Sequence, residues 1–248
     1  MAVPGGRSRA RRLARAAWIP AGFLLLAGCE DSLGRPPLRP TGPPAVTACL
    51  TGQGDLIADV NNDGHPDRVA DPSHRGALLT ITFGVGTARQ ETVTTRELAD
   101  RTAGRQPYVR AAVADFDRDG WSDLLVVAGQ EQRGDDPVPP RVAELRLGPF
   151  SNTGRGRRVV PLHLGATKDI VVADHDHDSH PDVTAYTYSG DGTYAFVARL
   201  GDEDTGLRSD GGAYGTDQDG TGYRPTDRLP HSGLSPFYPA CHPRGPAG

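Results

Sequence analysis

Short apolar segments recur along this chain, and each is bounded by a run of polar residues. Three of them lie directly before an Asp-rich run, at 55–58, 110–114 and 169–173. Three others lie directly after the same runs, at 68–70, 124–127 and 183–186. Short apolar segments flanked by Asp, Asn and Gly are typical of β-strands. The pattern therefore predicts three units of strand, polar loop and strand.

More strands follow in each unit. A third strand that ends in glycine is predicted at 78–84, 142–148 and 194–201, and a fourth at 90–94 and 158–164. Thr94 and Glu97 have the spacing of a helix capping box, which predicts one short helical turn between the first two units. Four strands in about 60 residues is the size of a β-propeller blade. The fold class predicted is all-β, with three four-stranded propeller-like repeats at about 55–109, 110–168 and 169–201.

The polar loops have the spacing of a calcium-binding loop. They begin at Asp59, Asp115 and Asp174, and acidic residues or Asn occupy positions 1, 3, 5 and 9 of each. Calcium takes six to eight oxygen ligands, which alternate side chains of a tight loop can supply together with the backbone carbonyl of position 7. The predicted ligands, about three ions in all, are Asp59, Asn61, Asp63, His65 and Asp67; Asp115, Asp117, Asp119, Trp121 and Asp123; and Asp174, Asp176, Asp178, His180 and Asp182.

Two details limit this interpretation. An EF-hand needs Glu at position 12, where the chain has Ala70, Val126 and Ala185, so these loops are not EF-hands. Position 6 is glycine in two loops but Ser179 in the third, where serine fits a left-handed turn less well. The alternative that the loops are only surface turns stays open for any single copy. Three copies with a spacing of 56 and then 59 residues favour a repeat.

The combination of an Asp loop, an apolar strand and a glycine-terminated strand resembles the FG-GAP/VCBS repeats of integrin alpha chains and many bacterial surface proteins. The resemblance covers about 55–201. It implies β-propeller blades, each with calcium in the loop between its first two strands. Closed propellers have four to eight blades, so whether three repeats close into a ring is left open. Residues 217–223 contain a possible remnant of a fourth loop, in a tail (202–248) that is predicted to be irregular.

The first residues are predicted to be an export signal. Five arginines precede an apolar segment at 16–27 that is too short to span a bilayer as a stable helix. Leu26-Ala27-Gly28-Cys29 resembles the lipobox of bacterial lipoproteins, which implies that residues 1–28 are removed and that Cys29 is lipidated. An ordinary secretory signal with a chance cysteine is the alternative. Residues 29–44 are rich in proline and are predicted to form a tether, which leaves 45–248 as the repeat domain.

The two remaining cysteines, Cys49 and Cys241, flank the repeats. In an exported protein such a pair predicts a disulfide, with two buried thiols as the alternative.

Charge and motifs narrow the function. Without residues 1–28 the chain has 22 basic and 31 acidic side chains, of which 11 are aspartates of the three loops, so the acidity matches metal-ligand charge. No basic stripe favours nucleic acid, and no motif for a catalytic serine, zinc or phosphate is present in the sequence. His175 and His177 raise a soft-metal alternative, but they occupy positions 2 and 4 of the loop.

The sequence therefore predicts a non-enzymatic, calcium-stabilised, lipid-anchored extracytoplasmic binding or scaffold protein. The alternative is a carbohydrate-binding or carbohydrate-active protein, because sugar-handling proteins also use such blades. Tyr186, Tyr188 and Tyr194 are candidates either for packing or for contact with a ligand. The predicted partners are the membrane through the lipid and an unidentified protein or glycan. Self-association is a third possibility.

Overall fold

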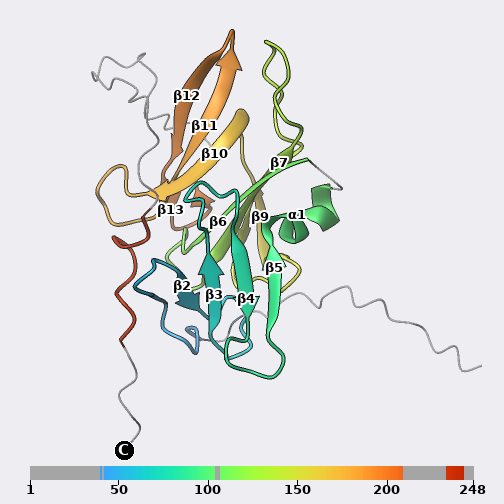
Figure 1. Ribbon diagram of the computed structural model, residues 1–248. Coiled ribbons are helices and arrows are strands. Elements are labelled where there is room, and N and C mark those ends of the chain that lie inside the picture. Colours follow the sequence, from blue (N-terminus) through green and yellow to red (C-terminus); the bar gives the residue numbers. More distant parts are fainter. Residues whose placement is uncertain (1–39, 41, 104–106, 209–232, 243–248) are drawn as a thin grey trace, which may run out of the picture. The chain divides into compact units, whose positions relative to one another are not determined.

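The computed structural model describes residues 40, 42–103, 107–208 and 233–242. Within these ranges the chain is an all-β protein with antiparallel sheets, none of which closes on itself (Figure 1). No helix among the described residues is long and apolar enough to cross a membrane. The predicted signal, Cys29, most of the tether and residues 217–223 lie outside the described ranges.

The first sheet is a five-stranded meander in which each strand pairs with the next along the chain. Four of its strands match predicted segments, whereas the short first strand, which contains Cys49, was not predicted. The strands are β1 (Cys49–Leu50), β2 (Leu56–Ala58), β3 (Asp67–Ala70), β4 (Thr80–Phe83) and β5 (Glu91–Thr94).

The second and third sheets repeat this meander. The second has the four predicted strands, but the third has three strands in the part of the chain that is described, so the predicted fourth strand is not found there. Their strands are β6 (Tyr108–Ala114), β7 (Asp123–Gly129), β8 (Val142–Leu147) and β9 (Arg158–Pro161), then β10 (Ala166–Ala173), β11 (Asp182–Gly190) and β12 (Thr193–Arg199). A separate small hairpin, β13 (Gly201–Asp202) with β14 (Gly206–Leu207), begins the segment that was predicted to be irregular.

The predicted helical turn is a longer element, α1 (Thr95–Ala103). Its start has the predicted capping box: the Thr94 backbone N–H donates to the Glu97 carboxylate at 2.7 Å, and the Glu97 N–H donates to the Thr94 hydroxyl at 3.4 Å. The helix extends beyond one turn because Leu98 and Ala99 are almost completely buried in the core. Tertiary packing therefore decided its length.

The second sheet is buried on both faces. Along β6, Ala111 and Val113 belong to one hydrophobic cluster, which also contains the first sheet and α1. Ala112 and Ala114 belong to a second cluster, which contains β10 and β11 of the third sheet. Because successive side chains of a strand point to opposite faces, the second sheet lies between the other two. Stacking of this kind is what repeats need in order to bury a continuous core.

The first strands of the second and third sheets, β6 and β10, donate backbone hydrogen bonds to a segment outside their own sheets. The β3–β4 connection supplies two carbonyls: Gly76 O accepts from Ala111 N of β6 at 2.9 Å, and Arg75 O accepts from Ile170 N of β10 at 3.3 Å. Gly76 has φ +73°, and a side chain there would meet the Ala111 carbonyl oxygen at 2.7 Å. A connection between two strands of one sheet thus joins the other two sheets.

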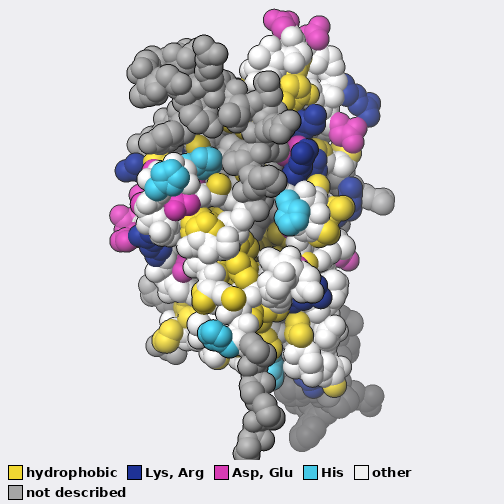
Figure 2. Space-filling model, turned by 60° about the vertical axis from the view of Figure 1, so that its left-hand side comes forward, with side chains coloured by type: hydrophobic (Ala, Val, Ile, Leu, Met, Phe, Trp, Pro, Cys, Tyr) yellow, Lys and Arg dark blue, Asp and Glu magenta, His cyan; other side chains and the backbone are white. Residues whose placement is uncertain are grey.

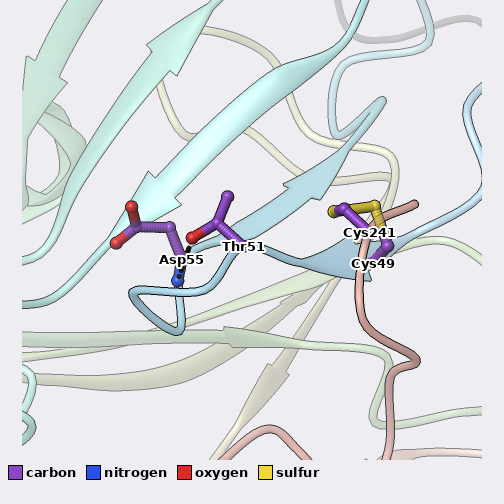
Figure 3. Close-up of a disulfide and its surroundings, with 4 residues drawn as sticks. All are labelled: Cys49, Thr51, Asp55 and Cys241. Atoms are coloured by element: carbon purple, nitrogen blue, oxygen red, sulfur yellow. Dashed lines mark hydrogen bonds between the residues drawn. A yellow bond between two sulfur atoms is a disulfide. The ribbon is translucent and has the colours of Figure 1, made fainter. Parts of the chain in front are cut away.

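Cys49 and Cys241 form a disulfide that fixes the C-terminal segment to β1 (Figure 3). Leu50 and Cys241 add backbone hydrogen bonds of 2.7–2.8 Å on the same edge, between Leu50 N and Pro239 O and between Cys241 N and Leu50 O. Because the two cysteines are 192 residues apart, the chain-entropy model gives a stabilisation of about 5 kcal/mol. The bond joins both ends of the described repeat region.

Candidate metal centre

The three Asp loops connect the first pair of long strands in each sheet. The first loop (59–67) joins β2 to β3, the second (115–123) joins β6 to β7, and the third (174–182) joins β10 to β11. Positions 4 and 6 have positive φ in all three, between 53° and 89°. Ser179 adopts φ 62° at position 6, so serine does not prevent the turn in the third loop.

Backbone N–H groups bind the loop carboxylates in the same way in each copy. The N–H of position 6 donates to Oδ2 of position 1 at 3.0, 3.0 and 3.2 Å. The N–H of position 7 donates to the carboxylate of position 5 at 2.7–2.9 Å. These bonds are local, because successive residues of a tight loop supply donor and acceptor. They fix one oxygen of each of these carboxylates within its loop.

The aspartate at position 9 connects each loop to the rest of its sheet. Asp67, Asp123 and Asp182 are all 0 % exposed. In each copy Oδ2 accepts from the N–H of position 2 at 2.7–2.9 Å. Oδ1 accepts from the glycine N–H at or just after the end of the third strand at 2.7–2.8 Å. A single buried carboxylate therefore closes the loop and holds the third strand against it.

The glycines that receive this contact are Gly84, Gly148 and Gly201. A side chain at Gly148 would overlap the Ser122 carbonyl, and one at Gly201 would meet the His180 ring at 2.6 Å. Gly84 has φ +61°. The sequence showed that every third strand ends in glycine, which was the available signal. The reason for it, close approach to the loop, required the structure.

Two loops bring three carboxylates together. Asp115, Asp117 and Asp123 form one group, and Asp174, Asp176 and Asp182 form the other. Within each group, one carboxylate oxygen from each residue lies within 4.8 Å of those of the other two. In each group one oxygen is both buried and without a hydrogen-bond partner: Asp115 Oδ1 in the second loop and Asp174 Oδ1 in the third. A buried polar atom without a partner costs about 1–3 kcal/mol, and a cation between the carboxylates would remove that cost.

The first loop differs at the same atom. Its position-1 oxygen, Asp59 Oδ1, accepts a hydrogen bond from Asp63 N at 3.1 Å, so it is not left without a partner. Asn61 replaces the position-3 carboxylate, and its side-chain amide donates to Asp63 at 3.0 Å. The structure does not bring the predicted acids Asp59, Asp63 and Asp67 into a three-carboxylate group. The groups of three carboxylates therefore occur in the second and third loops, and the first loop has an amide oxygen in place of one carboxylate.

Burial without a cation raises the pKa of the ligand carboxyls. Desolvation is the largest cause, and neighbouring carboxylates add to it. The pKa of Asp115 is raised to about 7 and that of Asp117 to about 6. The pKa of Asp123 is raised well above its ordinary value. In the first and third loops, desolvation also raises the pKa of Asp59, of Asp67 (to about 7) and of Asp182. A bound cation would stabilise the charged form of each of these groups.

The position-5 aspartates lie outside the two three-carboxylate groups. Asp119 pairs with the guanidinium of Arg157, which also lies 3.7 Å from Asp117. Asp178 pairs with Arg118 of the second loop at 3.9 Å. Sequence reasoning missed Arg157, because it lies 34 residues beyond the second loop and follows no motif.

At position 7 the predicted ligand is the backbone carbonyl, and the side chains of these residues lie elsewhere. Trp121 is 3 % exposed, as expected for a packing residue. The ring of His180 hydrogen-bonds Phe116 O at 2.8 Å and so joins the third loop to the second. His65 is exposed. The ring of His175, at position 2, hydrogen-bonds the Thr184 hydroxyl, and neither His175 nor His180 belongs to a three-carboxylate group.

The donor set of both groups consists of oxygen atoms, which suits a hard cation such as Ca²⁺ or Mg²⁺ better than a soft metal. The residues present therefore fit the predicted ion in the second and third loops. A comparison with protein-family models and with curated proteins finds no match for this chain.

Proposed function

We propose that the protein is a calcium-stabilised, lipid-anchored extracytoplasmic binding or scaffold protein built of FG-GAP/VCBS-type repeats. The observation that supports this most directly is the pair of buried oxygens without a partner, Asp115 Oδ1 and Asp174 Oδ1, each among three aspartates. Calcium would coordinate these oxygens and bring its charge to groups whose burial otherwise opposes ionisation. The role of the ion is to hold the loop against its sheet.

The arrangement of the sheets supports propeller-like repeats. Each of the three sheets is a meander whose first two long strands flank an Asp loop, and the second sheet lies between the other two. We infer that each sheet is one blade. Completion of a ring would need further repeats or a second copy. Sedimentation of the delipidated protein with and without calcium tests the second copy, and a monomer in both conditions would contradict it.

Thermal unfolding tests the calcium sites. Each site filled at about 100 times its Kd would stabilise the fold by about 2.7 kcal/mol, so two sites would raise the Tm by roughly 10–20 °C relative to metal-free protein. Magnesium should have a smaller effect, because it requires a tighter octahedron. The variant Asp117→Ala/Asp176→Ala should lose the effect, whereas Asp135→Ala, at an exposed acid outside the loops, should keep it. An unchanged Tm of the natural protein in saturating calcium would refute the proposal.

Lipid anchoring rests on the sequence at 26–29 and is tested separately. Bacteria that express the protein with a labelled fatty acid should incorporate the label, and Cys29→Ala should abolish incorporation. If the protein with its natural sequence were released into the medium without the fatty-acid label, lipid anchoring would be contradicted.

The carbohydrate alternative depends on the tyrosines of the third sheet. Tyr186 and Tyr194 stack with ring centroids 4.8 Å apart. The ammonium of Lys168 lies over both rings, 5.9 and 5.0 Å from their centroids, and occupies a face on which a sugar would stack. This contact counts against the two tyrosines as a platform for a sugar ring. Binding to a glycan array that is lost in Tyr194→Ala would favour the alternative.

The face shown in Figure 2 carries basic and acidic side chains side by side. Contact with nucleic acid would require clustered basic charge. The proposed partners are the membrane, through the lipid, and an unidentified protein or glycan.

A further inference from the structure

The C-terminal segment 233–242, called the tail clip here, contacts all three sheets. Gly233 N donates to Val172 O of β10 at 3.2 Å, and Leu50 N of β1 donates to Pro239 O at 2.8 Å. Leu234 packs against both hydrophobic clusters. The disulfide between Cys241 and Cys49 of β1 is the last anchor of the tail clip.

The tail clip reaches one of the metal loops through Tyr238. The backbone N–H of Asp115, the first ligand of the second loop, donates to the Tyr238 hydroxyl at 2.8 Å. One phenol therefore contacts the loop at its first ligand. Within the described residues, the hydrogen bond between the tail clip and a loop goes to the second loop.

Cys49 is itself firmly placed. It lies on β1, and the turn from β1 to β2 is closed by Asp55 N, which donates to the Thr51 hydroxyl at 3.1 Å (Figure 3). Cys241 follows Tyr238 by three residues. The disulfide thus limits how far Tyr238 can move away from Asp115.

We propose that the tail clip positions the second loop for its cation, so that the cation affinity of the second loop depends on Tyr238 and on the Cys49–Cys241 disulfide, whereas that of the third loop does not. The proposal rests on the proposed function, because it assumes that both loops bind calcium. Tyr238 acts as a positioning residue: it binds the backbone of a ligand and not the ion. Loss of the disulfide by thiol exchange with an external dithiol, which leaves two thiols on the protein, would weaken one site selectively.

The test is calcium titration by calorimetry, with each site measured alone. The second loop is isolated in an Asp176→Ala background and the third in an Asp117→Ala background. Tyr238→Phe removes the acceptor of the Asp115 N–H and should weaken the second site about tenfold, equal to about 1.4 kcal/mol. The third site should stay within about twofold. Tyr188→Phe is the matched control, since the Tyr188 hydroxyl accepts a backbone N–H from Gly192 at 2.9 Å in a distant hairpin.

The disulfide is tested by Cys49→Ser/Cys241→Ser and by reduction of the natural protein with a dithiol. Both should weaken the second site at least as much as Tyr238→Phe, and adding Tyr238→Phe to the double variant should then have a smaller effect than it has alone. Retained third-site affinity shows that the variants are folded.

The outcomes separate this inference from the proposed function. If both sites of the natural protein bind calcium and Tyr238→Phe leaves the second site unchanged, the tail clip proposal is wrong and the calcium proposal stands. If both sites weaken equally, the tail clip acts through general stability and the proposal is also wrong. If neither site of the natural protein binds calcium, both proposals fail.

Discussion

The buried position-9 aspartates offer the sharpest test of how the loops are held. Replacing Asp123 by Ala would remove two short hydrogen bonds, from Phe116 N at 2.8 Å and from Gly148 N at 2.7 Å. Hydrogen bonds to a charged group contribute about 1.5–3 kcal/mol each, so the gross loss is about 3–6 kcal/mol. Part of it is offset, because burial of the carboxylate itself is unfavourable and raises its pKa. We expect a net loss of about 2–4 kcal/mol in metal-free protein.

Asp119→Ala is the matched control in the same loop. Asp119 is more exposed, and its carboxylate accepts one backbone hydrogen bond and pairs with Arg157. Its removal should cost less than about 1 kcal/mol in metal-free protein. The comparison is made in metal-free protein, so that any loss of bound calcium does not contribute to the difference between the two variants.

The assay is urea unfolding followed by circular dichroism, with the slope of the transition checked for equality among variants. Asp67→Ala and Asp182→Ala repeat the experiment in the first and third loops, where the same two hydrogen bonds exist. The reasoning would be refuted if metal-free Asp123→Ala were within 1 kcal/mol of Asp119→Ala. It would then follow that water or backbone rearrangement replaces the lost acceptor.

Three further predictions concern pH, charge and packing. The pKa values of Asp67, Asp115 and Asp117 are raised to about 7, 7 and 6, so the metal-free fold binds more protons than the unfolded chain, and its stability should fall as pH rises from about 4 to about 7. In saturating calcium, stability should instead rise with pH. Urea unfolding at several pH values, in resin-treated buffer and in buffer with calcium, measures both dependences. If the free energy of unfolding changed with pH in the same way in both buffers, the prediction would be wrong. Arg157→Gln removes a positive charge beside Asp117 and Asp119, so it should raise the calcium affinity of the second loop about tenfold, as measured by calorimetry. A lower affinity would mean that Arg157 orders the ligands. Gly76→Ala should lower the free energy of unfolding in urea by about 2–4 kcal/mol, because its Cβ would meet Ala111 O. Gly54 also has a positive φ, +84°, but no atom lies within 4 Å of its Cβ position, so Gly54→Ala should cost only about 1 kcal/mol. Equal losses would contradict the steric argument.

The strands and loops were predictable because they depend on neighbouring residues. The apolar segments at 110–114 and 124–127 predicted β6 and β7 to within two residues at each end. The capping box between Thr94 and Glu97 was also readable, since its partners are three residues apart. The length of α1 was not, because it depends on how Leu98 and Ala99 pack in the core.

The candidate site shows the same division. The spacing of the aspartates identified every carboxylate of the two three-carboxylate groups. It did not reveal that the first loop differs, since that depends on a hydrogen bond from Asp63 N to one particular oxygen of Asp59. The sequence also ranked the third loop lowest because of Ser179, whereas the structure gives that loop its turn and its group of three carboxylates.

What the sequence determined by itself is the repeat: alternating apolar segments, nine-residue loops with oxygen donors at alternate positions, and a glycine at the end of each third strand. These features follow from local geometry, in which a residue and its near neighbours fix strand, turn and ligand direction. The tertiary structure alone decided which carboxylates lack a partner, and which distant groups reach a loop. Arg157 and Tyr238 act on the second loop across 34 and 115 residues of chain, because stacked sheets and a terminal disulfide bring together segments whose contact no local pattern encodes.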